Sequence, residues 1–269
     1  MPHSPRSQLL TKQYRQRLDA QRDRLQRLAV ERWPTIEELD STDWTKRMAT
    51  AVEQAQVEAL RTTAGYLSAF LTLEMGKRTQ SYGIDSRSKA GFSTDGQPLG
   101  EGLRSPLIGV YVRLKKGSDA SEALGFGLSR ARRQVGMDFD AAHRLALLEA
   151  IDSDDRFAGW QRATNGTCGA CLAVAAHVHH GLSFPVHPGC HCVSEPVVSG
   201  VPNSFPRPTG TELFAQKSES EKNEAVGPKA AALLAVGAIE LSELVQYEEL
   251  DSDMPDLITQ RPVDQLLAQ

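Results

Sequence analysis

The pattern of apolar and polar positions predicts a mainly helical chain. From Leu9 to Val30, apolar residues recur at helical spacing on a strongly charged background, which is typical of an amphipathic helix with a narrow apolar stripe. A second helix is expected from about Thr42 to Met75, where apolar residues form one continuous side. Trp33-Pro34 separates the two helices, because the residue before a proline is pushed out of the α region.

The centre of the chain predicts a loop followed by further helices. Residues 76–102 are rich in Gly, Ser and Asp without a clear period, which indicates a long loop or hinge. Residues 106–116 are too short for periodicity to separate helix from strand, and we favour a helix. Two helices, 118–135 and about 138–151, are then expected to form a hairpin joined at Gly136. Asp138 or Asp140 would cap the second of them.

The composition changes after Arg156. Residues 156–198 combine Trp, Thr, Val, Phe and Cys with Gly and Pro, which predicts short strands and turns around a site. Residues 201–210 hold three prolines and are expected to form a stiff connector. Two helices, 218–226 and 228–247, are expected beyond it, and the last twenty residues are acidic and expected to be loosely held.

These patterns together predict a mainly α fold with a small α+β or irregular cysteine-rich module that resembles a zinc knuckle. We expect five parts along the chain. They are a basic amphipathic N-terminal helix or arm (1–34), a helical domain (35–152), a cysteine-rich metal-binding module (153–200), a proline-rich connector with short helices (201–247) and an acidic tail (248–269).

The charge is distributed unevenly along the chain. Residues 1–32 carry eight basic against three acidic side chains, a net charge of +5, and residues 211–269 carry four against twelve, a net charge of −8. This asymmetry predicts a contact between the first helix and nucleic acid or an acidic protein surface. A plain pair of solvated helical faces explains it equally well. We expect the first helix to act as a detachable arm outside the protein's own core.

No apolar run approaches the 18 to 20 or so residues that span a bilayer, and the N-terminus lacks the apolar block of a secretory signal. We therefore expect a protein made in the cytoplasm, with no membrane partner. All four cysteines lie between Cys168 and Cys192, and in a reducing compartment such clustering indicates a metal before a disulfide.

The cysteines form two half-sites. Cys168-Gly-Ala-Cys171 is a Cys-x2-Cys pair, and His187-Pro-Gly-Cys190-His-Cys192 offers two more sulfurs or an imidazole in place of one of them. Four such ligands suit tetrahedral zinc. Residues i and i+2 of an extended strand point to the same side, so Cys190 and Cys192 can both reach one ion. Disulfides formed after assembly, or free buried thiols, are the alternatives.

A structural metal is favoured over a catalytic one. His177, His179 and His180 lie between the half-sites, but no Asp or Glu occurs between Cys171 and Cys192 to act as a general base. The chain contains no His-Glu-x-x-His motif. We therefore expect the three histidines on a surface loop, no catalytic residues, and a protein that is not an enzyme.

The module resembles the phage Mu F-like minor head proteins, also called head morphogenesis proteins. The resemblance is carried by Gly159–Thr164, Cys168–Cys171, Phe184 and His187–Cys192. In that family the closing motif typically reads His-Pro-x-Cys-Arg-Cys, and here His191 stands in place of the arginine. The run Pro208–Phe214 looks like the start of the family's C-terminal segment.

The resemblance implies a low-copy component of the head of a tailed phage. Such a protein would join the procapsid near the portal and help to package or deliver DNA. The expected partners are the portal protein and the major capsid protein, with phage DNA as a further partner through the basic N-terminal helix. The alternatives are a zinc-containing nucleic-acid-binding module and a capsid maturation protease.

Overall fold

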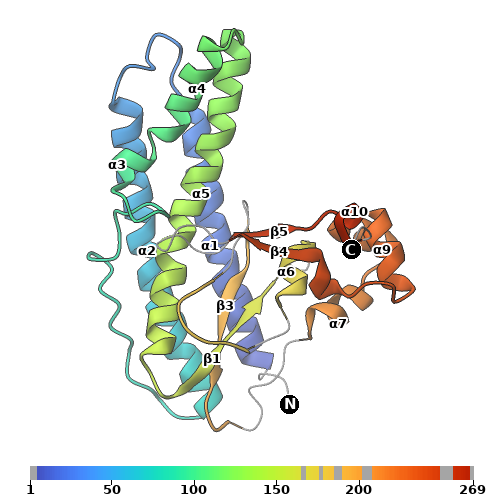
Figure 1. Ribbon diagram of the computed structural model, residues 1–269. Helices are drawn as coiled ribbons and strands as arrows, with labels where there is room; N and C mark the ends of the chain where they lie inside the picture. Colours follow the sequence, from blue (N-terminus) through green and yellow to red (C-terminus); the bar gives the residue numbers. More distant parts are fainter. Residues whose placement is uncertain are drawn as a thin grey trace. The chain divides into compact units, whose positions relative to one another are not determined.

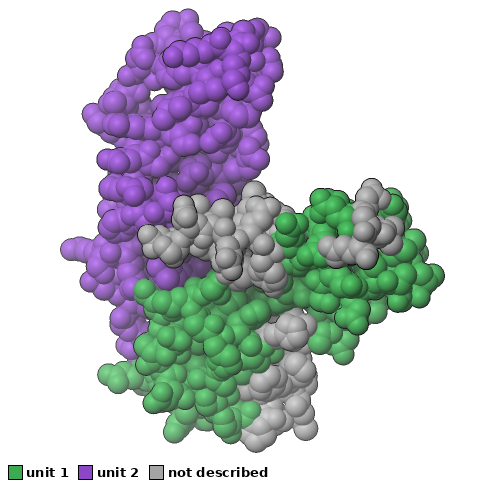
Figure 2. Space-filling model, viewed as in Figure 1, with its two compact units in different colours: residues 1–12, 67–80, 147–269 green, residues 13–66, 81–146 purple. Residues whose placement is uncertain are grey.

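The computed structural model describes residues 5–164, 168–175, 178–184, 190–201, 208–248 and 257–266. It is mainly helical (Figure 1), with 61% helix and 9% strand. It also includes a small three-stranded sheet and a cysteine cluster, which confirms the predicted fold class. The chain divides into two compact units (Figure 2). Unit 1 comprises Met1–Lys12, Leu67–Gln80 and Leu147–Gln269, and unit 2 comprises Gln13–Tyr66 and Ser81–Ala146.

The first two predicted helices are confirmed as α1 (Pro5–Glu31) and α2 (Asp43–Met75). In unit 2 they pack through an aromatic contact, because the rings of Tyr14 and Tyr66 stack with centroids 4.2 Å apart. The hydroxyl groups of Tyr14 and Thr63 lie 2.9 Å apart within hydrogen-bond distance. Among the helices of the described residues, none is both long enough and apolar enough to span a membrane.

The expectation that the first helix stays outside the protein's own core is wrong. Leu18 and Ala29 of α1 are at most 1% exposed, and Tyr14 and Leu25 are also buried. In unit 1, the Thr11 hydroxyl donates a hydrogen bond of 2.7 Å to Oε1 of the buried Glu195. The narrow apolar stripe is sufficient for packing, because small and polar side chains between its members are buried as well.

The predicted loop between α2 and the next helices is confirmed, with one short helix, α3 (Leu99–Gly102), near its end. Its second half is held in unit 2 by Gln56 of α2, which is fully buried. The Gln56 amide donates hydrogen bonds to the carbonyl oxygens of Phe92 and Asp138, and its oxygen accepts one from the Gly91 N–H. The segment 106–116 is helical, as we favoured, and forms part of α4 (Ser105–Lys115).

The predicted helical hairpin joined at Gly136 is wrong, because a single helix, α5 (Ala120–Asp152), covers both halves. Gly136 lies inside this helix, where α1 approaches it closely. A Cβ atom at this position would lie 2.9 Å from the Gln26 side chain. The glycine therefore serves close helix packing, and its sequence signal is the same as that of a turn.

Asp138 and Asp140 are buried in unit 2 and do not cap a helix. Burial raises the pKa of Asp138 to about 6, although Thr94 and Gln134 donate hydrogen bonds to it. Burial acts in the same direction on Asp140, but the positive charges of Arg144 and Arg22 outweigh it and lower the pKa of Asp140 to about 2. Asp140 is thus charged at neutral pH inside the helical unit.

Unit 1 contains a three-stranded antiparallel sheet in the order β2-β1-β3, from β1 (Phe157–Ala163), β2 (Val178–His179) and β3 (Val193–Val198). These strands confirm the short strands that the sequence predicted for residues 156–198. A register shift occurs at Gly159, where φ is +137°. A Cβ atom there would lie 2.5 Å from the His179 carbonyl oxygen, so only glycine fits.

Apart from the ends of α1, α2 and α5 and the sheet, the described part of unit 1 is built from short elements. They are α6 (Gly169–Ala173), α7 (Gly210–Ala215), α8 (Glu219–Val226), α9 (Pro228–Ala235), the 3-10 helix η1 (Leu241–Leu244), β4 (Val245–Glu248), β5 (Leu257–Gln260) and α10 (Val263–Leu266). The predicted helix 218–226 is confirmed, but the helix from Pro228 ends at Ala235, and β4 follows near its expected end. The three prolines of the predicted connector lie outside the described residues or at their edge.

The expectation of a loosely held tail is wrong for its described part. Residues Leu257–Gln260 form β5, which pairs with β4 in antiparallel register, with Val245 opposite Gln260. The Gln260 side chain also donates a hydrogen bond of 2.7 Å to the Val226 carbonyl at the end of α8. Acidic composition did not reveal a short strand whose partner lies in the preceding segment.

Candidate metal centre

Three cysteine sulfurs gather in unit 1. The Sγ atoms of Cys171, Cys190 and Cys192 all lie within 4.8 Å of one another, and all three side chains are buried. Four sulfurs around a tetrahedral zinc ion, each at about 2.3 Å, lie about 3.8 Å apart. The Sγ atoms of Cys171 and Cys190 are 3.7 Å apart. This cluster can hold a metal ion.

Cys171 is positioned by α6, a short helix that is fixed from two sides. Leu172 is fully buried in an apolar cluster with Phe214 of α7, Val226 of α8 and Leu244 of η1. A second, smaller cluster packs Ala170 against Val245 of β4. The segment after the sheet thus fixes the Cys-x2-Cys half-site through ordinary apolar packing.

Cys190 and Cys192 come directly before β3. Both are buried, at 4% and 2% exposed, and both sulfurs lie in the cluster. The prediction that a spacing of two residues brings both sulfurs to one site is therefore confirmed. Between them His191 is only half-buried.

Of the five predicted ligands, the structure brings three together. Cys168 stands directly before α6, is half-buried, and is a hydrogen-bond neighbour of Cys171, although it is not one of the three sulfurs within 4.8 Å of one another. His187 lies outside the described residues. No disulfide joins the four cysteines, and the 3.7 Å between the Sγ atoms of Cys171 and Cys190 is far above the 2.05 Å or so of a disulfide bond.

The thiols strongly affect one another's protonation. The hydrogen bonds of Cys171 with Cys168, Cys190 and Cys192, together with burial, raise the pKa of Cys171. A hydrogen bond from Cys171 lowers the pKa of Cys192, but the hydrogen bond with Cys190 and burial outweigh it and raise that pKa to about 11. A bare cluster of this kind holds its protons at neutral pH, and a metal ion has to displace them in order to bind.

Arg162 is a member of the site that the sequence did not single out. It lies on β1, is 1% exposed, and its Nη1 donates to the Sγ atoms of Cys190 at 3.7 Å and Cys171 at 3.9 Å. Its guanidinium also lies over the Phe184 ring, 4.1 Å from the centroid. The available signal was the spacing of Trp160 and Arg162, which places both on the same face of a strand.

The histidines between the half-sites do not join the cluster where they are described. His177 lies outside the described residues. His179 is half-buried in β2, stacks on Trp160 with ring centroids 4.4 Å apart, and lies 3.2 Å from the Val174 carbonyl oxygen. The expectation of a surface loop is therefore wrong for His179, while His180 is exposed as expected.

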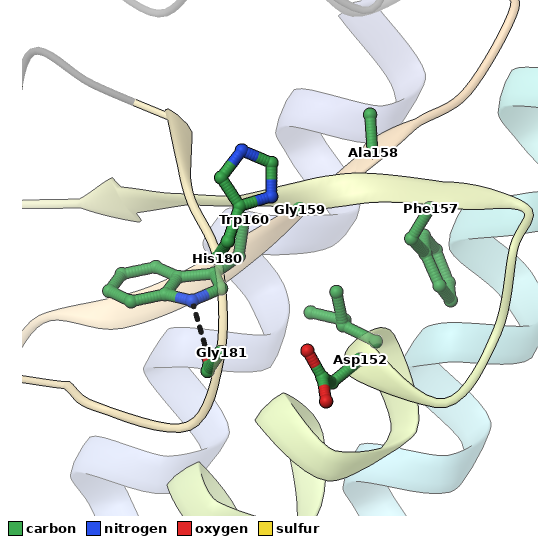
Figure 3. A pocket seen from close by; sticks show the side chains of 8 residues that line it. Asp152, Phe157, Ala158, Gly159, Trp160, His180 and Gly181 are labelled. Atoms are coloured by element: carbon green, nitrogen blue, oxygen red, sulfur yellow. Dashed lines mark hydrogen bonds between the residues drawn. The ribbon is translucent and has the colours of Figure 1, made fainter.

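A small hollow lies beside Trp160 (Figure 3). It is lined by the end of α5, the first half of β1 and the turn at His180-Gly181, and the Trp160 indole N–H donates a hydrogen bond of 3.3 Å to the Gly181 carbonyl. Asp152 and His180 are the ionisable side chains that line it. No cysteine lines it, so among the described residues the hollow is distinct from the thiol cluster.

Fold and site together define a mainly helical protein with a small sheet-and-helix module that carries a buried, arginine-flanked cysteine cluster. Comparisons with models of known protein families, with curated proteins and with solved structures found no match.

Proposed function

We propose that this protein is a minor head protein of a tailed phage, in which a structural zinc ion holds together the module that carries Cys171, Cys190 and Cys192. The proposal rests on one observation: the residues that carry the family resemblance are also the residues that meet in the structure. The segments that resemble the Mu F-like proteins, around Gly159–Thr164, Cys171 and Cys190–Cys192, are also the segments that meet at the thiol cluster. A motif spread over more than thirty residues thus belongs to one site.

Zinc is the proposed ion because three buried thiols are soft ligands, and the 3.7 Å between the Sγ atoms of Cys171 and Cys190 matches the spacing of ligands around a tetrahedral ion. Cys168, beside Cys171, is the proposed fourth ligand, since it completes a tetrathiolate and lies at the half-exposed edge. Four protein ligands leave no open position for substrate or water. We therefore propose a structural role for the metal and no enzymatic activity.

The proposed location is the phage head, and the proposed partners are the portal protein and the major capsid protein. In a small module, the binding free energy of a structural metal is also folding free energy. A zinc-loaded module would give an assembly protein a rigid surface, whereas an unloaded one would not.

The proposal is tested in virions and procapsids of a phage that encodes this chain. We expect quantitative mass spectrometry to find the chain in purified particles, at a copy number comparable with that of the portal protein and far below that of the capsid protein. A phage that carries the Cys171→Ser, Cys190→Ser double variant should incorporate much less of it. Absence of the normal chain from both kinds of particle would refute the proposal.

Contact with phage DNA is a second proposed role, and exposed basic residues on α1 favour it. Arg17, Arg24 and Arg27 are exposed in unit 2, and their spacing places them within about 80° of one another around the helix. Since the opposite side of α1 is packed in the core, this face can bind DNA without detachment of the helix. Phosphate contacts would come from the exposed face alone.

We expect neutralisation of these three arginines to glutamine to weaken DNA binding in a salt-dependent way. The slope of log affinity against log salt should fall by up to about 0.9 for each lost phosphate contact. Fluorescence anisotropy with duplex DNA at several salt concentrations measures it. The matched control is Lys46→Gln, Arg47→Gln, Arg61→Gln, which removes the same charge from exposed positions of α2. An equal effect of both triple variants would mean that only net charge matters.

A further inference from the structure

A buried positive charge lies against the cysteine cluster. Arg162 is 1% exposed, and its Nη1 donates to two of the three clustered sulfurs. The guanidinium is therefore hydrogen-bonded directly to two of the proposed metal ligands.

Charge balance links the arginine to the metal. A guanidinium is costly to bury in a poorly solvated place unless groups of opposite charge face it. Three thiolates with a divalent ion carry one net negative charge, and one guanidinium cancels it. With the metal bound, the buried half of the site is therefore neutral, and any further charge from Cys168 falls at its half-exposed edge.

The surroundings of Arg162 hold its side chain in this place. Phe184 lies over the guanidinium at 4.1 Å, and the same ring packs against Trp160 with centroids 5.0 Å apart. Strand β1 is the central strand of the sheet, and the backbone at Arg162 is paired with Ser194 of β3. The side chain thus has little freedom to turn away from the sulfurs.

We propose that Arg162 is a positioning residue of the metal centre, which donates N–H···S hydrogen bonds to the metal-bound thiolates of Cys171 and Cys190 and neutralises the charge of the buried zinc–thiolate group. This inference rests on the proposed zinc site and assigns to β1 a direct part in it. Loss of an outer hydrogen-bond partner typically weakens metal binding by about 10- to 100-fold.

The test compares Arg162→Gln, Arg162→Lys and the normal chain, each titrated with zinc against a chromophoric chelator. We expect Arg162→Gln to bind zinc about 10- to 100-fold more weakly, and Arg162→Lys, which keeps the charge, to lose less than about tenfold. Arg156→Gln is the matched control, because Arg156 lies just before β1 and pairs with Asp154 at the surface. It should bind zinc like the normal chain.

Cobalt provides a readout that general destabilisation would not change. Hydrogen bonds to thiolate lower the energy of its lone pairs, so the sulfur-to-cobalt charge-transfer bands should move to longer wavelength in Arg162→Gln, and less in Arg162→Lys. Should Arg162→Gln not fold, the band shift and affinity of Arg162→Lys carry the test. Unchanged affinity and unchanged bands in the arginine variants would overturn the role of Arg162 and leave the zinc site standing. Failure of the normal chain to bind zinc would refute the zinc site itself.

Discussion

Replacement of Cys171 with serine is expected to abolish tight zinc binding and to unfold the module around β1, β3 and α6. Cys171 is 1% exposed and lies within 4.8 Å of both other clustered sulfurs, so its loss removes a ligand that no neighbouring group can replace without rearrangement. Metal binding contributes about 10 to 16 kcal/mol to small structural zinc sites. The loss of most of that free energy would match or exceed the usual stability of a domain, about 5 to 15 kcal/mol.

Two measurements check this expectation. Elemental analysis of reduced protein should give one zinc per normal chain and much less than one in Cys171→Ser. Hydrogen exchange resolved by peptides should lose protection in 157–164, 168–175 and 190–198, while α1, α2 and α5 keep theirs within unit 2. Cys168→Ser is the graded comparison, because Cys168 is half-buried and should have a smaller effect. A reduced, folded normal chain without metal, or an equal loss of protection throughout the chain, would contradict the prediction.

Replacement of Asp140 with asparagine is expected to destabilise unit 2 by about 3 to 5 kcal/mol at neutral pH. The Asp140 carboxylate lies 2.6 Å from Nη2 of Arg22 and 3.6 Å from Nη2 of Arg144, and these side chains are all less than 10% exposed. Asparagine keeps the shape but removes the charge, so two buried guanidinium groups lose their common counter-ion. Urea denaturation followed by circular dichroism measures the change.

Asp19→Asn is the matched control, since Asp19 pairs with the same Arg22 at 2.9 Å but has a side chain that is 32% exposed. This variant should lower the free energy of unfolding by less than about 1 kcal/mol.

The stabilising contribution of Asp140 should also depend on pH, with a definite sign. Because the pKa of Asp140 is lowered to about 2 in the folded protein, its stabilising contribution is complete well above pH 4 and is lost as the pH falls towards 2. The difference in free energy of unfolding between the normal chain and Asp140→Asn should therefore disappear over that pH range. A difference that does not depend on pH would mean that the shape of the side chain, not its charge, is responsible.

The sequence predicted the long helices α1 and α2, the helical nature of α4, the short strands after Arg156 and the two cysteine half-sites. These features are local, because helical periodicity, the break at Trp33-Pro34 and the spacing of two residues between Cys190 and Cys192 each act within a few turns of chain. Gly136 was misread for the same reason. A glycine that ends a helix and a glycine that admits a neighbouring helix have the same local signature, and only the approach of Gln26 distinguishes them.

The sequence by itself determined that the chain is mainly helical and that its cysteines form one module, because composition, period and spacing are sufficient for those statements. Only the tertiary structure decided that α1 is packed in the core, that Asp140 is the counter-ion of two arginines from different helices, and that Arg162 meets the sulfurs. The physical reason is distance along the chain. Arg22 and Asp140 are separated by 118 residues, and Arg162 and Cys190 by 28. No local pattern encodes which buried charges will meet when the desolvation of each must be offset by the other.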